Sequence, residues 1–350
     1  MPVISRRVSR TVAVVAAAAA SSAFALPGVA LAHSAAVKTA SVQSAAVLKG
    51  QYQSAYSQRN KALWVTTAVG RTATPSAIYK LDPKTLAVEG VINPPVLDAT
   101  TGAVEGVYGI AVDDEYNRLW VTNTRNNTVA VYSQKTGEHL ATLPDVAHAR
   151  EIVVDEKHNT VWASAFGAAT LVAYDSRTLT EKKRITVTGS SPTGLAVDEK
   201  SGTLYATDLA GDQIIEVTRK SDTPALIPVG DGPISVALSS DGRFAYTANQ
   251  TAGTVSVVDT KKDAVVATYT AGAGALSVAY EERSKTVLVA NRTAASVSVI
   301  DARTGTVEET IATTANPNHI EAANGYAYLV DKSGAGAAGE DYLYKIKPAN

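Results

Sequence analysis

Residues 232–270 read GPISVALSSDGRFAYTANQTAGTVSVVDTKKDAVVATYT. Asp241-Gly242 lies between two apolar runs and supplies the positive φ that a tight hairpin needs. The stretch predicts four short antiparallel strands, because each of its four apolar runs shows the alternation of a half-buried strand. The runs are Ile234–Leu238, Phe244–Ala248, Val255–Val258 and Val265–Tyr269. A lone sheet of this size cannot bury both faces, so it needs neighbours of the same kind.

A tetrad led by an aromatic or apolar residue recurs along the chain and marks those neighbours. Its seven copies begin at Trp64, Trp120, Trp162, Tyr205, Tyr246, Leu288 and Tyr328. The first interval is 56 residues and the others are 40 to 43 residues. A Val-rich third strand follows, most clearly at Val255–Asp259. A period near 40 is the signature of propeller blades. We predict an all-β fold, a seven-bladed β-propeller of four-stranded antiparallel blades.

The two ends of the repeat array predict how the ring closes. The last copy stops after its third strand, because residues 347–350 leave no room for a fourth. Ala40–Leu48, ahead of the first blade, is a spare apolar-rich segment. We predict that this N-terminal segment pairs as the outer strand of the last blade, which removes an exposed sheet edge.

The first 32 residues are typical of a secretory signal peptide. They combine a positive start, an uninterrupted apolar run and a small-residue cleavage motif near Ala32-His33. Adjacent arginines at 6 and 7 leave twin-arginine export open beside general secretion, which we favour. We therefore expect a signal peptide over 1–32, a flexible leader over 33–40 and a single propeller domain over 41–350. The mature protein is expected to be secreted, outside the cytoplasm.

The charge, the cysteine content and the apolar segments of the chain exclude several classes of function. Removing residues 1–32 takes away three arginines and no acidic residue, which leaves a formal charge of −4 from the original −1. Basic residues are scattered among acids, so we expect no general nucleic-acid binding. The chain has no cysteine, which excludes disulfides and a cysteine nucleophile. No stretch of the mature chain is apolar enough to predict a membrane span.

The repeat also resembles a known family. Trp120-Val-Thr-Asn and Tyr246-Thr-Ala-Asn, each with its Val-rich third strand, resemble the repeats of the YVTN-repeat, YncE-like seven-bladed β-propellers. The resemblance covers about residues 41–347 and suggests a secreted bacterial member. It implies a fold and carries no catalytic residue.

Departures from the repeat indicate where a ligand could bind. Region 93–108 holds an insertion of about 14 residues, and 333–341 is a longer loop in the last blade. Polar residues also stand at the starts of inner strands, where most blades have Gly, Pro, Ser or Thr. Loops on a rigid scaffold carry function, so we predict ligand-binding candidates at the channel mouth. They are Glu105, Tyr108, His148, Arg150, Glu151, Asn318, His319 and Glu321.

A metal site is one possible use of these residues. His148 and His319, with nearby glutamates, have the ligand types for one. They belong to blades on opposite sides of the ring and lack short ligand spacing, so we predict neither a metal nor a cofactor. Gly-x-Ser-x-Gly and phosphate-loop motifs are missing from the sequence.

Two function classes remain open. We favour an exported, monomeric, non-catalytic binding or interaction protein that uses the loop face and channel mouth for a protein, glycan or small-molecule ligand. The alternative is an enzyme at the channel mouth, either a lactonase-like propeller hydrolase or a metal- or quinone-dependent enzyme, which rests on fold-level analogy. Its acid and base groups would come from Glu105, His148, Arg150, His319 and Glu321.

Overall fold

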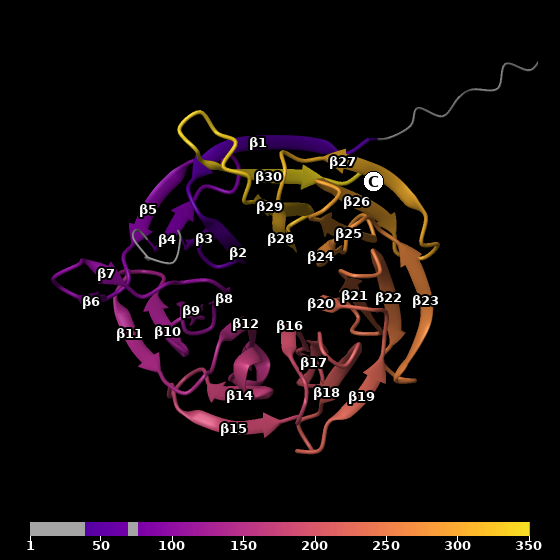
Figure 1. Ribbon diagram of the computed structural model, residues 1–350, viewed down its shortest axis with the longest axis horizontal. Helices are drawn as coiled ribbons and strands as arrows, with labels where there is room; N and C mark the ends of the chain where they lie inside the picture. Colours follow the sequence, from indigo (N-terminus) through magenta and orange to yellow (C-terminus); the bar gives the residue numbers. More distant parts are fainter. Residues whose placement is uncertain (1–38, 69–75, 350) are drawn as a thin grey trace, which may run out of the picture. The chain divides into compact units, whose positions relative to one another are not determined.

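The structure is a computed structural model that describes residues 39–68 and 76–349. Seven four-stranded antiparallel sheets surround a central axis, as the view down the ring in Figure 1 shows. The predicted all-β, seven-bladed propeller is confirmed. The predicted signal peptide, residues 1–32, and most of the leader lie outside the described residues.

Blades are numbered in chain order, and their strands form four concentric layers (Figure 1). The innermost strands are β2 (Gln51–Ser57), β8 (Ile110–Asp113), β12 (Ala149–Asp155), β16 (Pro192–Asp198), β20 (Pro233–Leu238), β24 (Ala275–Glu281) and β28 (Pro317–Ala323). The second strands are β3 (Ala62–Thr67), β9 (Arg118–Asn123), β13 (Thr160–Ala165), β17 (Thr203–Asp208), β21 (Phe244–Asn249), β25 (Thr286–Asn291) and β29 (Tyr326–Asp331). The third strands are β4 (Ala77–Leu81), β10 (Thr128–Ser133), β14 (Thr170–Asp175), β18 (Gln213–Val217), β22 (Thr254–Asp259), β26 (Ser296–Asp301) and β30 (Asp341–Lys347). The rim strands are β5 (Val88–Ile92), β11 (His139–Leu143), β15 (Glu181–Thr186), β19 (Ala225–Pro228), β23 (Ala264–Thr270), β27 (Val307–Ala312) and β1 (Ser41–Leu48).

Blade 5 forms from the stretch that predicted the fold. Its four predicted runs are β20 to β23, each extended by one or two residues. Gly242 has φ +73° in the turn between β20 and β21. The backbone N–H of Ser239 donates to the Phe244 carbonyl across this turn (2.8 Å). Glycine is favoured here because other residues reach this left-handed region only with strain.

The ring is closed by the two ends of the chain. β1 pairs antiparallel with β30, with Ser41 opposite Lys347 and Leu48 opposite Asp341. The predicted outer strand over Ala40–Leu48 is therefore confirmed. The Asp341 carboxylate also accepts the Gln51 N–H at 2.8 Å, which ties the start of blade 1 to blade 7.

The apolar core lies between adjacent blades. The residue that leads each tetrad is buried in all seven blades. Trp64, for example, clusters with Ile110 and Leu119 of blade 2, and Trp120 stacks on Tyr174 of blade 3 with ring centroids 6.1 Å apart. Burial of these apolar surfaces is the main favourable contribution to folding.

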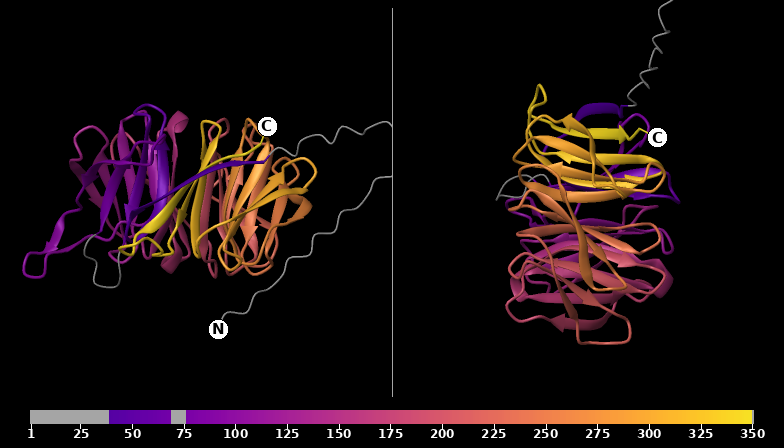
Figure 2. Two further views of the ribbon diagram at one scale, coloured as in Figure 1. Left: turned by 90° about the horizontal axis from the view of Figure 1, so that it is seen from above. Right: turned by 90° about the vertical axis from the view of Figure 1, so that its right-hand side faces the viewer.

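The insertion after blade 1 forms a small hairpin of β6 (Val96–Asp98) and β7 (Ala103–Val104), which projects outward from the ring (Figures 1 and 2). Two single-turn 3-10 helices, η1 (Glu156–His158) and η2 (Phe166–Ala168), flank β13 in blade 3. Within the described ranges, no helix has the length and apolar character needed to cross a membrane.

Candidate functional site

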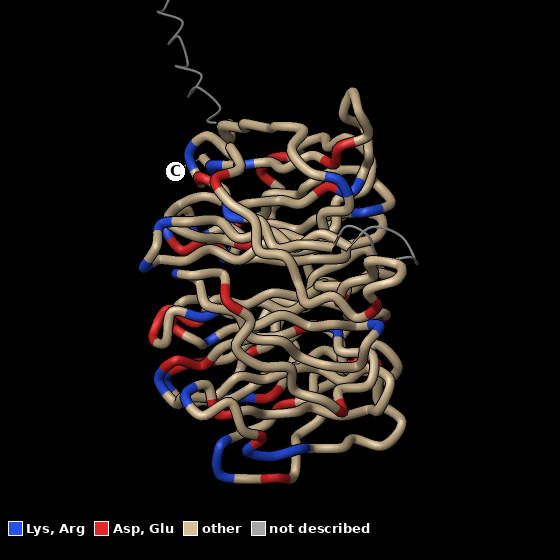
Figure 3. The backbone as a smooth tube through the Cα atoms, turned by 90° about the vertical axis from the view of Figure 1, so that its left-hand side faces the viewer, with Lys and Arg blue, Asp and Glu red and all other residues tan. Residues whose placement is uncertain are grey.

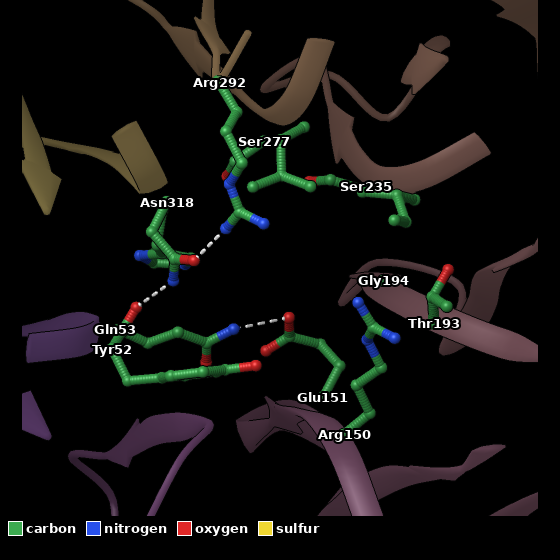
Figure 4. Close-up of a pocket in the computed structure, with 13 residues that line it drawn as sticks. Tyr52, Gln53, Arg150, Glu151, Thr193, Gly194, Ser235, Ser277, Arg292 and Asn318 are labelled. Atoms are coloured by element: carbon green, nitrogen blue, oxygen red, sulfur yellow. Dashed lines mark hydrogen bonds between the residues drawn. The ribbon is translucent and has the colours of Figure 1, made fainter. Parts of the chain in front are cut away.

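A polar pocket lies on the axis where the inner strands begin. The loops between second and third strands reach the same end of the ring, because each inner strand runs away from it. The pocket encloses about 90 Å³ and is lined by residues of six of the seven inner strands, with Arg292 added from the loop after β25 (Figure 4). The site is therefore assembled from residues spread over the whole ring.

Blade 2 supplies no lining side chain because its chain must pass through a tight space. A Cβ at Gly109 would lie 2.7 Å from the Arg150 carbonyl oxygen and 3.1 Å from Gln53 Oε1, so only glycine fits.

A hydrogen bond spans the place that blade 2 leaves free. Gln53 Nε2 donates to Glu151 Oε2 at 2.9 Å. A side chain of blade 1 thus reaches one of blade 3 directly.

A repeated hydrogen bond links neighbouring inner strands at this level. In each case a side chain of one blade accepts the backbone N–H of the next blade's inner strand. The pairs are Gln53 Oε1 with Ile110 (3.2 Å), Ser235 Oγ with Val278 (3.3 Å), Ser277 Oγ with Ile320 (3.1 Å) and His319 Nδ1 with Ser54 (3.3 Å). His319 therefore occupies a position that serine holds in blades 5 and 6.

The bond from Ser54 fixes the protonation state of His319. Because Nδ1 accepts, the ring proton sits on Nε2, which can then only donate. Burial lowers the pKa of His319 to about 4, so the ring is neutral at physiological pH. His319 thus offers a neutral hydrogen-bond donor to the channel.

Two glutamates have raised pKa values in the channel. Burial raises the pKa of Glu151 to about 7, and it raises the pKa of Glu321 to about 7 as well. Glu321 Oε2 accepts the Tyr56 N–H at 3.2 Å. It lines a deeper chamber of about 330 Å³, which shares Glu151 and His319 with the mouth pocket.

Arg292 is held at the mouth by Asn318. The Asn318 Oδ1 accepts from Arg292 Nη2, and the Asn318 amide donates to the Tyr52 carbonyl at 2.5 Å. Arg292 Nε is buried without a hydrogen-bond partner among the described residues. Burial lowers the pKa of Arg292, and the nearby positive charge of Arg150 lowers it further. The two guanidinium groups approach the central space from opposite sides (Figure 4).

Lys332 adds a third cation beside the pocket. Its Nζ lies 4.4 Å from the centroid of the Tyr52 ring. Burial lowers the pKa of Lys332 and Arg292 lowers it further, while Asp341 acts in the opposite direction. The Asp341 oxygens accept backbone N–H groups of Gln51 and Gly334, each at 2.8 Å. In the part of the chain that the structure describes, no ion pair involves Arg150, Arg292 or Lys332.

Four of the eight predicted site residues line the mouth pocket: Arg150, Glu151, Asn318 and His319. Glu321 lies in the deeper chamber. Tyr108 lies just outside the pocket, with its ring edge-on to Tyr52 at 5.0 Å between centroids.

Glu105 and His148 lie away from the mouth pocket. Glu105 is buried and accepts from Asn123 Nδ2 at 2.8 Å, because the insertion folds back onto blade 2. His148 is exposed against Phe166, with ring centroids 5.3 Å apart. Over residues 39–68 and 76–349, no three His, Asp or Glu side chains gather closely enough to hold a metal ion.

Comparison with known proteins identifies the family. Residues 88–335 match the family model described as YNCE-like beta-propeller. The chain belongs to this family. It is 31% identical over 231 residues to the uncharacterized protein YncE of Escherichia coli O157:H7, covering 61% of this chain and 63% of that protein. The same protein of Salmonella typhi gives 31% identity with the same coverage. The chain therefore spans less than two thirds of the length of these relatives.

A solved structure shares the fold. Virginiamycin B lyase from Staphylococcus aureus superposes with a TM-score of 0.70, covering 88% of this chain and 99% of the lyase. Sequence identity is 11%, so this similarity concerns the architecture alone.

Sequence patterns did not single out Tyr52, Arg292 or Lys332, yet the repeat of this YncE-like propeller contains a signal for the two cations. The residue directly after each tetrad is, in blade order, Ala68, Thr124, Phe166, Leu209, Gln250, Arg292 and Lys332. Only blades 6 and 7 place a cation there. In five blades the backbone N–H of this residue donates to a carbonyl that directly precedes the inner strand of the same blade. The residue after the tetrad therefore has an equivalent position near the axis in these blades.

Proposed function

We propose that this protein is a non-catalytic binding protein that works outside the cytoplasm and captures a small anionic ligand at the channel mouth. One observation supports this most directly. Arg150 and Arg292 line the mouth pocket, Lys332 lies beside it over Tyr52, and none of the three has an ion pair among the described residues. The acidic residue that lines the pocket with the two arginines is Glu151, and burial raises its pKa to about 7.

Unpaired cations in a partly buried site are unfavourable by themselves. They lose solvation and repel each other, and the depressed pKa values of Arg292 and Lys332 have both causes. A carboxylate or phosphate would supply the missing countercharge and could accept from the free Arg292 Nε and from His319 Nε2. A volume of about 90 Å³ suits phosphate or a short dicarboxylate.

The pocket is less suited to hydrolysis. A nucleophilic mechanism needs a nucleophile within hydrogen-bond reach of a base. The accepting nitrogen of His319 is occupied by Ser54, and Glu151 is engaged by the Gln53 amide. The three tryptophans, which a stacked quinone cofactor would use, are buried between blades.

The outer surface of the ring shows no comparable gathering of basic residues on the side that Figure 3 shows. On the side of the ring that Figure 3 shows, basic and acidic positions are interspersed along the loops. The formal charge of the whole chain is −1. Local convergence at the axis, rather than overall charge, therefore supports the proposal.

Isothermal titration of the protein with phosphate and succinate, against uncharged succinamide, tests the proposal. We expect anion binding that weakens with added salt and that Arg292→Gln weakens by about tenfold or more. Arg177→Gln, which removes an equal charge from an exposed turn, is the matched control and should bind like wild type. Equal affinity in the Arg292→Gln variant, or turnover of the bound ligand, would contradict the proposal.

A further inference from the structure

A second concave site lies between blades 5 and 6, on the opposite end of the ring from the mouth. It is formed around the turns that follow inner strands β20 and β24. The groove has a volume of about 540 Å³, within the range of pockets that hold drug-sized molecules. Its walls are mainly aromatic, with Phe244, Tyr246, Tyr269 and Tyr280 as the large side chains.

The groove differs from the equivalent places in blades 2 and 3 at two positions, which carry shorter side chains. In blade 3, the row Trp162, Ala173 and Lys183 places the lysine Nζ 5.9 Å from the Trp162 ring centroid. The same row in blade 5 is Tyr246, Val257 and Ala267, so no long side chain of the rim strand reaches toward Tyr246.

Blade 2 shows how a neighbour can fill such a space. Its row ends in Ala141, equivalent to Ala267 of blade 5, but Tyr174 of blade 3 stacks over Trp120. By strand register, the residue of blade 6 equivalent to Tyr174 is Ile300. Ile300 is shorter than a tyrosine, and the side chain of blade 6 that stacks on Tyr246 is Tyr280 of β24.

The remaining groups indicate the ligand. Tyr246 and Tyr280 stack with centroids 5.7 Å apart and planes 5° from parallel. Tyr246 is buried in this pair, whereas Tyr280 and Phe244 are partly exposed to the groove. Lys285 and Arg303 also line the groove, and no ion pair is found for either within the described residues. Asp241 accepts from Ser239 Oγ and from the Arg243 N–H within its own turn, so its carboxylate is engaged locally.

We propose that this groove, defined by Phe244, Tyr246, Tyr269, Tyr280, Lys285 and Arg303, is a second binding site for a planar aromatic ligand that carries an acidic group. The ring packs against the partly exposed Phe244 and Tyr280, and the acidic group pairs with Lys285 and Arg303. The site is independent of the channel mouth, because the two share no lining residue.

Fluorescence titration with 1-anilinonaphthalene-8-sulfonate, an aromatic sulfonate, tests the groove. We expect saturable binding that Ala267→Gln weakens at least about tenfold, because the longer uncharged side chain fills the groove beside Val257. Ala141→Gln, in the same row of blade 2, is the matched control and should bind like wild type. Unchanged affinity in Ala267→Gln, at an unchanged melting temperature, would overturn the proposal.

Competition then tests the charge requirement. We expect naphthoate to displace the probe better than uncharged naphthalenemethanol, and this preference to disappear in the Lys285→Gln/Arg303→Gln double variant. Equal displacement by both compounds from the wild type would overturn the acidic-ligand assignment. Arg292→Gln should leave probe binding intact, which separates this site from the mouth.

Discussion

Blades 5 and 7 share one backbone plan but differ in origin and chemistry. The four strands of blade 5 come from consecutive residues, whereas blade 7 takes its outer strand β1 from the opposite end of the chain. At equivalent registers, blade 5 carries Ile234, Ser235, Ala237 and Gln250, and blade 7 carries Asn318, His319, Glu321 and Lys332. The repeat therefore maintains the scaffold, while the blade that closes the ring also supplies much of the polar chemistry at the channel.

Removing β1 should have the largest effect. Deletion of residues 41–48 exposes the edge of β30 and removes Leu48 from its apolar cluster with Val330 and Leu343. We expect the melting temperature measured by circular dichroism to fall by at least about 10 °C. Deletion of residues 33–38, in the predicted leader, should leave it unchanged. A deletion variant as stable as wild type would show that closure adds little to the ring.

Glu321→Gln should make stability less dependent on pH. The folded-state pKa of Glu321 is raised to about 7 from 4.5, so its contribution to stability is present below about pH 4.5 and is lost as pH rises through about 7. Between about pH 4 and pH 8, Glu321 should lower the unfolding free energy of the wild type by up to about 3 kcal/mol. The Glu321→Gln variant lacks this group, so its unfolding free energy should not show that loss. Urea unfolding at both pH values measures this. A constant difference between the two proteins would refute the raised pKa.

Lys332→Gln gives blade 7 the residue that blade 5 has at Gln250. Loss of one of the three cations should weaken binding of the small anion at the mouth by about tenfold, which corresponds to about 1.4 kcal/mol. Calorimetric titration measures this affinity. Lys135→Gln removes the same charge from an exposed turn of blade 2 and should not change it. Equal weakening in both variants would point to overall charge rather than to the site.

His319→Ser should have the smallest effect, because serine accepts the equivalent N–H bond in blades 5 and 6. His319→Ala leaves the Ser54 N–H without its acceptor and should cost about 1 kcal/mol more in unfolding free energy. Chemical denaturation compares the two variants. If serine and alanine were equally destabilising, the inter-blade bond would not be the reason for a polar residue here.

The fold could be predicted almost completely from the sequence. Alternating runs such as Phe244–Ala248, the turn glycine Gly242 and the period near 40 residues depend on local chemistry that recurs in every blade. Even ring closure followed from counting, since the last blade lacks a strand that Ala40–Leu48 supplies.

The site could be predicted only in part. Arg150, Glu151, Asn318 and His319 stand where an unusual polar residue begins an inner strand, and the axis brings them together. Glu105 has the same polar character, but the insertion folds back and buries it against Asn123 instead.

By itself, the sequence determined the number of blades, their strand order and the closing strand, because each depends on short-range alternation and repetition. The tertiary structure alone decided which side chains meet at the axis and which groove between blades stays open. The mouth pocket joins residues from Tyr52 to His319, and the groove at blades 5 and 6 lies where Ala267 and Ile300 replace longer side chains of other blades. Such outcomes depend on contacts between blades, and no pattern within a single repeat contains them.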